Sequence, residues 1–205
     1  MNCSFLSWNV RGLRRPEKVR AVAKVLRKSN ARVAFIQELK LEVLKLHVYK
    51  RWLGRNFGEV EVSISRGASG GLISLWGVNF FVLDRKVVLD RIIILVGQMK
   101  QFDLKCGLIN VYAPNDPSER KSFFDFLSNF IVALQLPVVM GDDFNTVKMA
   151  NERMGVTMHI GSLKYYEELI QRNELIDLPK MAATLLCSRG NQDSCKRIGS
   201  ILGIT

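Results

Sequence analysis

Short apolar runs bounded by Gly, Pro, Asn or Asp are the main feature of the chain, and such runs predict buried strands. The predicted strands are residues 3–8, 32–36, 60–64, 71–76, 80–83, 91–97, 102–111 and 138–140. Because the strands follow one another with only a few helices between them, the pattern favours an α/β sandwich of mixed sheets over an alternating βα array.

Three stretches have the spacing of helices, with apolar residues recurring every three or four positions. The first begins at Pro16, a residue suited to a first turn, and ends near Lys28, where a cation suits the helix dipole. The second begins at the capping box 116–119 and ends before Pro137. The third covers residues 163–175. Neither a linker nor an internal repeat interrupts these elements, so we expect a single domain over all 205 residues.

The net charge of the chain indicates a class of binding partner, whereas its hydrophobic content does not. The chain has 30 Lys and Arg against 19 Asp and Glu, a net charge of +11, while 48% of its residues are hydrophobic. The hydrophobic content is typical of a globular domain, and the basic excess favours a polyanionic partner, either nucleic acid or an anionic membrane surface. No apolar run approaches the roughly 20 residues of a membrane span, so we expect nucleic acid as partner and no membrane. An incidental excess of lysine is the alternative.

Cysteine and histidine are too dispersed to predict a zinc site. Cys3, Cys106, Cys187 and Cys195 show no C-x-x-C spacing, and the two histidines are far apart in the sequence. Scattered cysteines are typical of a reducing compartment, and the first residues lack the basic and apolar segments of a signal peptide. We therefore expect an intracellular protein, in the nucleus or the cytoplasm.

Four predicted strands end in polar side chains that are able to carry chemistry. These are Asn9 in SFLSWN, Glu38 in VAFIQE, Tyr112 and Asn115 in LINVYAPN, and Asp143 and Asn145 in VVMGDDFN. In α/β folds, ligand chemistry gathers beyond the ends of strands. Each of these residues, taken alone, is also typical of the start of an ordinary loop.

Taken together and in this order, the motifs WNVRGL, FIQELK, NVYAPN and GDDFN resemble those of the endonuclease/exonuclease/phosphatase superfamily. The narrower resemblance is to the apurinic-endonuclease-like domain of plant non-LTR (LINE-type) retrotransposons, and it is strengthened by GASGGLISLW, RNELIDLP and CSRGNQDSCKRI. The similarity covers residues from about 3 to 202. It implies a four-layer, DNase I-like α/β sandwich of two mixed sheets flanked by helices, and a monomeric, Mg²⁺-dependent phosphodiester hydrolase acting on DNA.

The resemblance also implies a metal site. Glu38 matches the metal-binding glutamate of these enzymes, and Asn9 matches the asparagine beside that metal. A carboxylate oxygen is a hard ligand that suits Mg²⁺ or Mn²⁺. Glu38 and Asn9 are therefore the expected metal residues.

Other residues match the family's phosphate chemistry. Asp143 and Asn145 match the catalytic aspartate and its amide partner, and Tyr112 matches a residue at the scissile phosphate. Asn115 and Arg11 are expected to contact the phosphate or the DNA. The aspartate would align or deprotonate water, and the amide would stabilise the developing charge.

The two adjacent aspartates are not equivalent. In an extended strand alternate side chains share one face, so Asp143 and Asn145 are able to address one phosphate together while Asp142 faces the other way. Relatives commonly have a second glycine at the position of Asp142. We therefore expect Asp142 to be either a solvated turn residue or a local disturbance of the site.

The chain departs from the family near its end. In RIGSIL, Gly199 stands where the resemblance places a catalytic aspartate, and no terminal Ser-Asp-His appears before Thr205. We read the chain as C-terminally truncated, lacking the last strand, with weak or lost activity; His47 and His159 do not match the missing histidine. The alternatives are a catalytically dead nucleic-acid-binding remnant and a phosphatase of the same fold.

Overall fold

The computed structural model of the chain describes residues 5–41, 52, 56–64, 70–144, 160–177 and 201–203. Its strands are β1 (Phe5–Asn9), β2 (Val33–Gln37), β3 (Glu59–Ser63), β4 (Leu72–Trp76), β5 (Phe81–Leu89), β6 (Ile92–Met99), β7 (Leu104–Tyr112), β8 (Val138–Asp143), β9 (Ile176–Asp177) and β10 (Ile201–Gly203). Its helices are α1 (Pro16–Lys28), α3 (Pro117–Leu134) and α4 (Ile160–Arg172).

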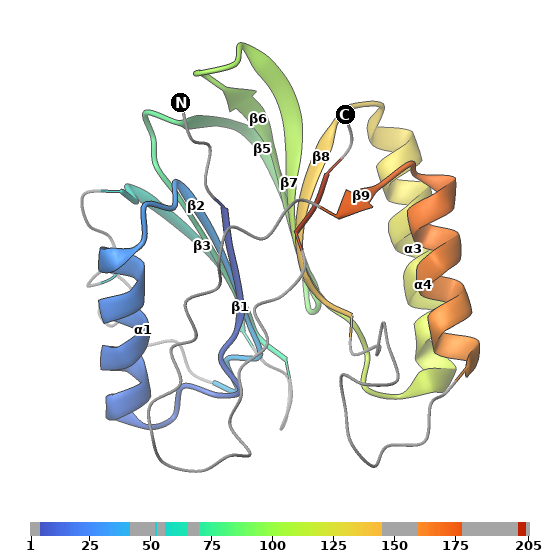
Figure 1. Ribbon diagram of the computed structural model, residues 1–205, viewed down its shortest axis with the longest axis horizontal. Helices are drawn as coiled ribbons and strands as arrows, with labels where there is room; N and C mark the ends of the chain where they lie inside the picture. Colours follow the sequence, from blue (N-terminus) through green and yellow to red (C-terminus); the bar gives the residue numbers. More distant parts are fainter. Residues whose placement is uncertain are drawn as a thin grey trace.

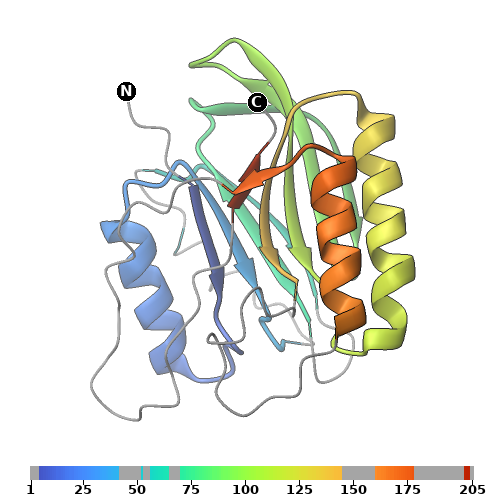
Figure 2. The ribbon, with the colours of Figure 1, turned by 45° about the vertical axis from the view of Figure 1, so that its right-hand side comes forward.

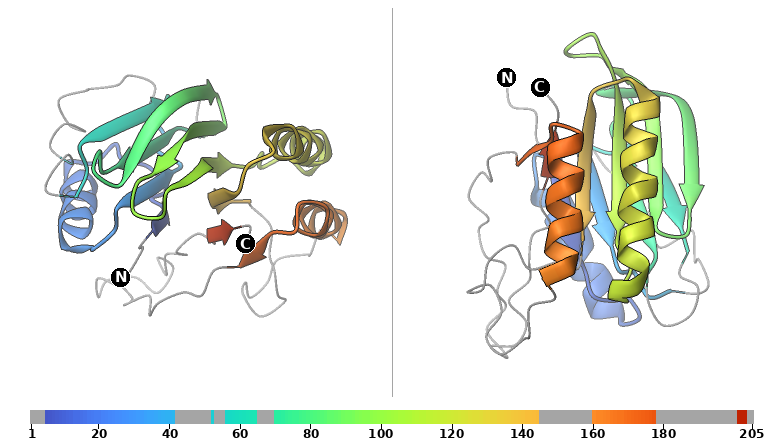
Figure 3. Two further views of the ribbon diagram at one scale, coloured as in Figure 1. Left: turned by 90° about the horizontal axis from the view of Figure 1, so that it is seen from above. Right: turned by 90° about the vertical axis from the view of Figure 1, so that its right-hand side faces the viewer.

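The strands form two mixed sheets that face each other. One sheet has four strands in the order β1-β2-β4-β3, and the other has six in the order β5-β6-β7-β8-β10-β9. Helix α1 covers the outer face of the smaller sheet, while α3 and α4 cover the larger one (Figures 1 and 3). The expected α/β sandwich of two mixed sheets flanked by helices is therefore confirmed.

Three apolar clusters hold these layers together. Val22 and Leu26 of α1 pack on the smaller sheet, and Phe124 and Leu127 of α3 pack on the larger one. A third cluster, which includes Phe35 of β2, fills the space between the sheets. Each layer therefore buries a face that would otherwise be exposed to water. Among the described residues, no helix is long and apolar enough to cross a membrane.

The second helix begins as its sequence predicts. Asp116 is the N-cap of α3, and its side-chain oxygen accepts hydrogen bonds from the backbone N–H of Ser118 at 2.9 Å and from the Ser118 hydroxyl at 2.8 Å. The N–H of Glu119 donates instead to the backbone oxygen of Asp116. The cap is thus confirmed, although its side-chain bond is made one residue earlier than in a capping box.

Strands β5 and β10 show clear departures from the strands that the apolar pattern predicts. The predicted strand 80–83 continues as β5 to Leu89, because its exposed polar residues Asp84, Arg85 and Lys86 lie on an edge strand and hide the apolar alternation. Strand β10 pairs antiparallel with β8 and with β9. The larger sheet therefore continues beyond β8, which the sequence pattern did not predict.

Several strands end at the same end of the sandwich, the lower end in Figure 1. The parallel pair β1 and β2 ends there, as does the parallel pair β7 and β8. Helices α1 and α3 begin at this end and run back along the sheets (Figure 2). Residues that follow these four strands are therefore brought close together from distant parts of the chain.

A glycine allows the two sheets to approach closely beside this end. A Cβ added to Gly141 of β8 would lie 2.2 Å from Cδ2 and 2.7 Å from Cβ of Phe35 in β2. Any side chain at this position would push the sheets apart. The glycine that opens GDDFN is thus a requirement of packing between the sheets.

Candidate functional site

A hydrogen bond between the two sheets defines the candidate site. The side-chain nitrogen Nδ2 of Asn9, at the end of β1, donates to Oδ2 of Asp143, at the end of β8. The other amide atom, Oδ1 of Asn9, accepts from the backbone N–H of Arg11 at 2.8 Å. Asn9 is therefore fixed on both sides, and it holds the half-buried carboxylate of Asp143 at the mouth of the sandwich.

The alternation along β8 decides which aspartate belongs to this site. Val138 and Met140 lie in the core under α3 and α4, whereas Val139 packs in the core between the sheets. Asp143 therefore shares the inner face with Val139, and Asp142 shares the outer face with Met140. The expected opposite orientation is confirmed.

The expected solvent exposure of Asp142 is wrong. Its exposed fraction is only 2%, because β8 continues through Asp143 and carries Asp142 into the layer beneath the helices. Position 142 is therefore not in a turn. Asp142 is a buried strand residue.

Glu38 follows β2 directly and lies beside Asn9. The register pairs Asn9 with Gln37, and Val10 N–H donates to the Gln37 carbonyl at 3.0 Å. The Glu38 side chain is 13% exposed, and its Oε1 lies 2.7 Å from Nζ of Lys40. Two of the expected site residues, Asn9 and Glu38, are thus neighbours on adjacent strands.

Tyr112 and Asn115 lie on the other side of Asp143. Tyr112 is paired with Asp143 in the β7–β8 register, and its buried hydroxyl is 3.3 Å from Nδ2 of Asn115. The guanidinium of Arg120 donates to the backbone oxygens of Pro114 at 3.0 Å and Asn115 at 2.9 Å. These bonds fix the turn between β7 and α3, and with it the position of the Asn115 amide.

Sequence reasoning missed Arg91, the residue before β6. Its backbone oxygen accepts from Tyr112 N–H at 3.0 Å, and its guanidinium carbon lies 5.8 Å from the centre of the Tyr112 ring. Among the described residues, its buried Nη1 has no hydrogen-bond partner. Arg91, just before β6, therefore lies in one row with Tyr112 and Asp143 at the ends of β7 and β8, a relation that appears only once the register is known.

A buried polar bridge beneath the site was also missed. Gln37 Nε2 donates to Ser7 Oγ and to Asn110 Oδ1, each at 3.0 Å. Asn110 Nδ2 donates to the Ile73 carbonyl at 2.9 Å and to Ser74 Oγ at 3.2 Å. The four polar side chains, from β1, β2, β4 and β7, are at most 1% exposed. Their hydrogen bonds join the two sheets in the core, next to the strand ends that carry the site residues.

The side chains of this site suit a hard divalent cation. Asn9, Glu38 and Asp143 offer only carboxylate and amide oxygens, and Glu38 already accommodates the cationic group of Lys40. No cluster of three or more His, Cys, Asp or Glu that would suit a metal occurs in the described part of the chain. Carboxylate and amide oxygens fit Mg²⁺ or Mn²⁺ better than a softer metal.

Some expected positions fall outside the described residues. These are Asn145, Gly199, His47 and His159. Their assignments stay predictions.

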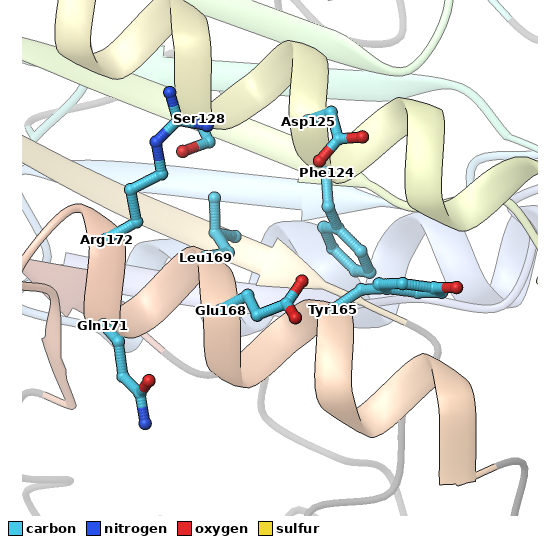
Figure 4. Close-up of a pocket in the computed structure, with 8 residues that line it drawn as sticks. All are labelled: Phe124, Asp125, Ser128, Tyr165, Glu168, Leu169, Gln171 and Arg172. Atoms are coloured by element: carbon cyan, nitrogen blue, oxygen red, sulfur yellow. The ribbon is translucent and has the colours of Figure 1, made fainter.

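A second polar region lies between α3 and α4 (Figure 4). It is a groove of about 460 Å³, lined by Phe124, Asp125, Ser128, Tyr165, Glu168, Leu169, Gln171 and Arg172. Its two carboxylates are each paired within their own helix, Asp125 with Lys121 at 2.9 Å and Glu168 with Lys164 at 3.7 Å. The motifs of the sequence place no residue in this groove.

Among known sequences, the chain is similar to a transposon protein. No protein-family model matches the chain. The Xenopus laevis protein described as the transposon TX1 uncharacterized 149 kDa protein is 26% identical over 186 residues, which cover 87% of this chain. The chain spans only 14% of the length of that protein.

Among solved structures, the fold of the chain is similar to those of nucleases and of a phosphatase. The AP endonuclease LMAP of Leishmania major has a TM-score of 0.75 and 14% identity, covering 98% of this chain and 78% of that one. The endonuclease domain of the telomere-specific non-LTR retrotransposon TRAS1 has a TM-score of 0.63 and 14% identity, covering 99% and 85%.

The 3′ phosphatase NExo from Neisseria, bound to a product DNA hairpin, has a TM-score of 0.68 and 16% identity, covering 98% and 86%. The chain thus shares the DNase I-like fold, two mixed sheets between layers of helices, with AP endonucleases, a retrotransposon endonuclease domain and a DNA 3′ phosphatase.

Proposed function

We propose that the chain is a divalent-metal-dependent phosphodiester hydrolase that nicks DNA, of the retrotransposon type and of its plant LINE branch. The observation that carries the proposal is the bond from Asn9 to Asp143, which joins the two sheets at the strand ends beside Glu38. The transposon relative and the shared nuclease fold support it.

The metal-binding residues in this proposal are Glu38 and Asn9. A bound Mg²⁺ would neutralise charge that develops on the phosphate. Asn9 also orients Asp143 through the hydrogen bond from its Nδ2. The carboxylate of Asp143 is therefore held toward the mouth of the sandwich, where it would align or deprotonate the attacking water.

The remaining residues hold the substrate. Tyr112 and Asn115, in mutual contact, would contact the scissile phosphate, and Asn145 would stabilise the developing charge with its amide. Arg11, an exposed residue beside Asn9, would contact the DNA backbone. We propose a low rate, because Gly199 stands where the resemblance places a catalytic aspartate.

Nicking of supercoiled plasmid with and without Mg²⁺ tests this proposal. We expect slow, Mg²⁺-dependent nicking that Glu38→Gln abolishes. Glu17→Gln is the matched control, since Glu17 is an exposed acid in the first turn of α1, 3.6 Å from Arg20. Nicking that is unchanged in Glu38→Gln would overturn the assigned site.

A non-catalytic role in nucleic-acid binding is the second candidate, and the net charge of +11 is the observation that favours it. It predicts salt-sensitive binding to duplex DNA without nicking. Titration of the duplex at two salt concentrations, in the presence of Mg²⁺, distinguishes it from the first. A third activity, phosphatase action, would be detected as phosphate release from a 3′-phosphorylated oligonucleotide.

A further inference from the structure

The lysine two residues after Glu38 occupies the carboxylate that the proposed function assigns to the metal. Nζ of Lys40 lies 2.7 Å from Oε1 of Glu38, and the two side chains are 36% and 13% exposed. An ion pair that is partly shielded from water is stronger than one on the open surface. The metal-binding residue of the proposal therefore already has a cationic partner from its own loop.

The backbone imposes this pairing. Glu38 and Lys40 both have left-handed backbone conformations, with φ values of 58° and 54°. Such conformations are unfavourable for residues other than glycine and persist only where surrounding contacts hold them. The conformation of this short loop is thus a consequence of its neighbours.

Two neighbouring segments supply those contacts. From the loop before α1, Gly12 N–H donates to the Glu38 carbonyl at 2.7 Å, and Arg14 Nε donates to the Lys40 carbonyl at 3.1 Å. From the start of the β4 region, the Gly70 carbonyl accepts from Lys40 N–H at 3.0 Å. The loop is held on both sides by these hydrogen bonds, and the backbone conformation that they fix places Lys40 beside Glu38.

We infer that Lys40 is an internal counter-cation that competes with the divalent cation for Glu38 and, once released, binds a phosphate of the DNA. The inference rests on the proposed function. Because the released ammonium has three donors and no carboxylate partner, it suits a phosphate oxygen. Metal binding and DNA binding would then strengthen each other through one side chain, and such coupling is reciprocal.

The affinity for Mn²⁺, measured by calorimetry without DNA, tests the competition. We expect Lys40→Met to bind Mn²⁺ about fivefold more tightly than the wild-type protein, because a partly buried ion pair is worth about 1 kcal/mol. Lys18→Met is the matched control. Lys18 donates to the backbone oxygen of Arg11 at 3.0 Å, so its removal takes the same charge from the same end and leaves the Lys40–Glu38 ion pair in place.

The affinity for a short DNA duplex, with and without Ca²⁺, tests the release. In the wild-type protein Ca²⁺ is expected to tighten DNA binding, and in Lys40→Met this gain should fall about threefold through the loss of one phosphate contact. The two effects have opposite signs. A variant that is merely damaged would lose affinity for both ligands, and Lys40→Gln provides a second, polar replacement.

Each result decides between the two proposals. Equal Mn²⁺ affinities for Lys40→Met and Lys18→Met, with binding that Glu38→Gln abolishes, would overturn the competition while leaving the metal site intact. An undiminished Ca²⁺ gain in Lys40→Met would overturn the release. Absence of Mn²⁺ binding in the wild-type protein and in Lys40→Met would overturn the competition and the proposed metal site together.

Discussion

The strand-end site and the α3–α4 groove are both polar, yet their side chains are connected differently. In the groove, the two acidic side chains pair with lysines one turn away on the same helix. At the strand ends, Asn9 reaches Asp143 across 134 residues and from one sheet to the other. Local pairs of the first kind solubilise a helix, whereas a non-local bond requires the whole fold to place two groups. The α3–α4 groove therefore says less about function than the strand-end site does.

The largest expected difference between the regions is in catalysis. Asp143→Asn keeps an oxygen that is able to accept from Asn9 but removes the base, so we expect Mg²⁺-dependent nicking to fall by about 10²- to 10⁴-fold. Glu168→Gln removes a carboxylate from the groove and should leave the rate within about twofold, as expected of a surface group. Plasmid nicking by the two variants checks this. Similar losses of nicking activity in the two variants would show that the strand-end site is no more important for catalysis than the groove.

A smaller difference is expected in stability. Asn110→Ala removes the centre of the buried bridge, so Gln37 Nε2 loses one of its two acceptors and the Ile73 carbonyl loses a donor, at a cost of about 2–4 kcal/mol in the free energy of unfolding. Ser128→Ala, in the lining of the groove, removes one bond from Asn173 at 2.8 Å and should cost about 1 kcal/mol. Urea unfolding of both variants measures the difference. Equal costs would show that the bridge is no more important than an ordinary buried bond.

The smallest expected effect is on the way the stability of the fold depends on pH. The hydrogen bond from Ser118 N–H holds the pKa of Asp116 below its ordinary value of 3.8. The bond to Asp125 raises the pKa of Lys121 above 10.5. A lowered acid pKa stabilises the fold above pH 3.8 and is lost as the pH falls below it, whereas the raised lysine pKa contributes below pH 10.5 and is lost above it.

Asp116→Asn separates these effects, because asparagine is also a good N-cap but does not titrate. We expect the variant to lose less thermal stability than the wild-type protein as the pH falls from 5 to 2.5, and to behave like it at pH 11. Thermal unfolding followed by circular dichroism gives the comparison. An identical acid response in both proteins would contradict the assigned role of the cap.

The sequence predicted those parts of the fold that depend on local patterns. The apolar run 138–140 and the cap at Asp116 were found because a buried strand and a helix start each have a local signature. The exposed second half of β5 was not found, because an edge strand with charged residues has no apolar alternation. The apolar pattern did not indicate the strand β10 either, since three residues carry too little pattern.

For the site, the sequence supplied residues but not their relations. The strand-end motifs indicated Asn9, Glu38 and Asp143, and the fold brings Asn9 to both of the others. The partnership of Lys40 with Glu38 and the row from Arg91 to Asp143 depend on backbone conformation and register. Neither is encoded in the identity of a single residue, so neither was predicted.

The bond from Asn9 to Asp143 also bears on the order of folding. Each partner belongs to a sheet that gains most of its contacts within itself, so their meeting requires closure of a long loop. We expect the site to be absent from any state in which only one sheet has formed. A fluorescent metal ion such as Tb³⁺ would then respond late during refolding, after the secondary structure is complete. Asn9 and Asp143, proposed to bind the metal and to align water, thus also join the two sheets, and occupancy of the site would report that the sandwich has closed.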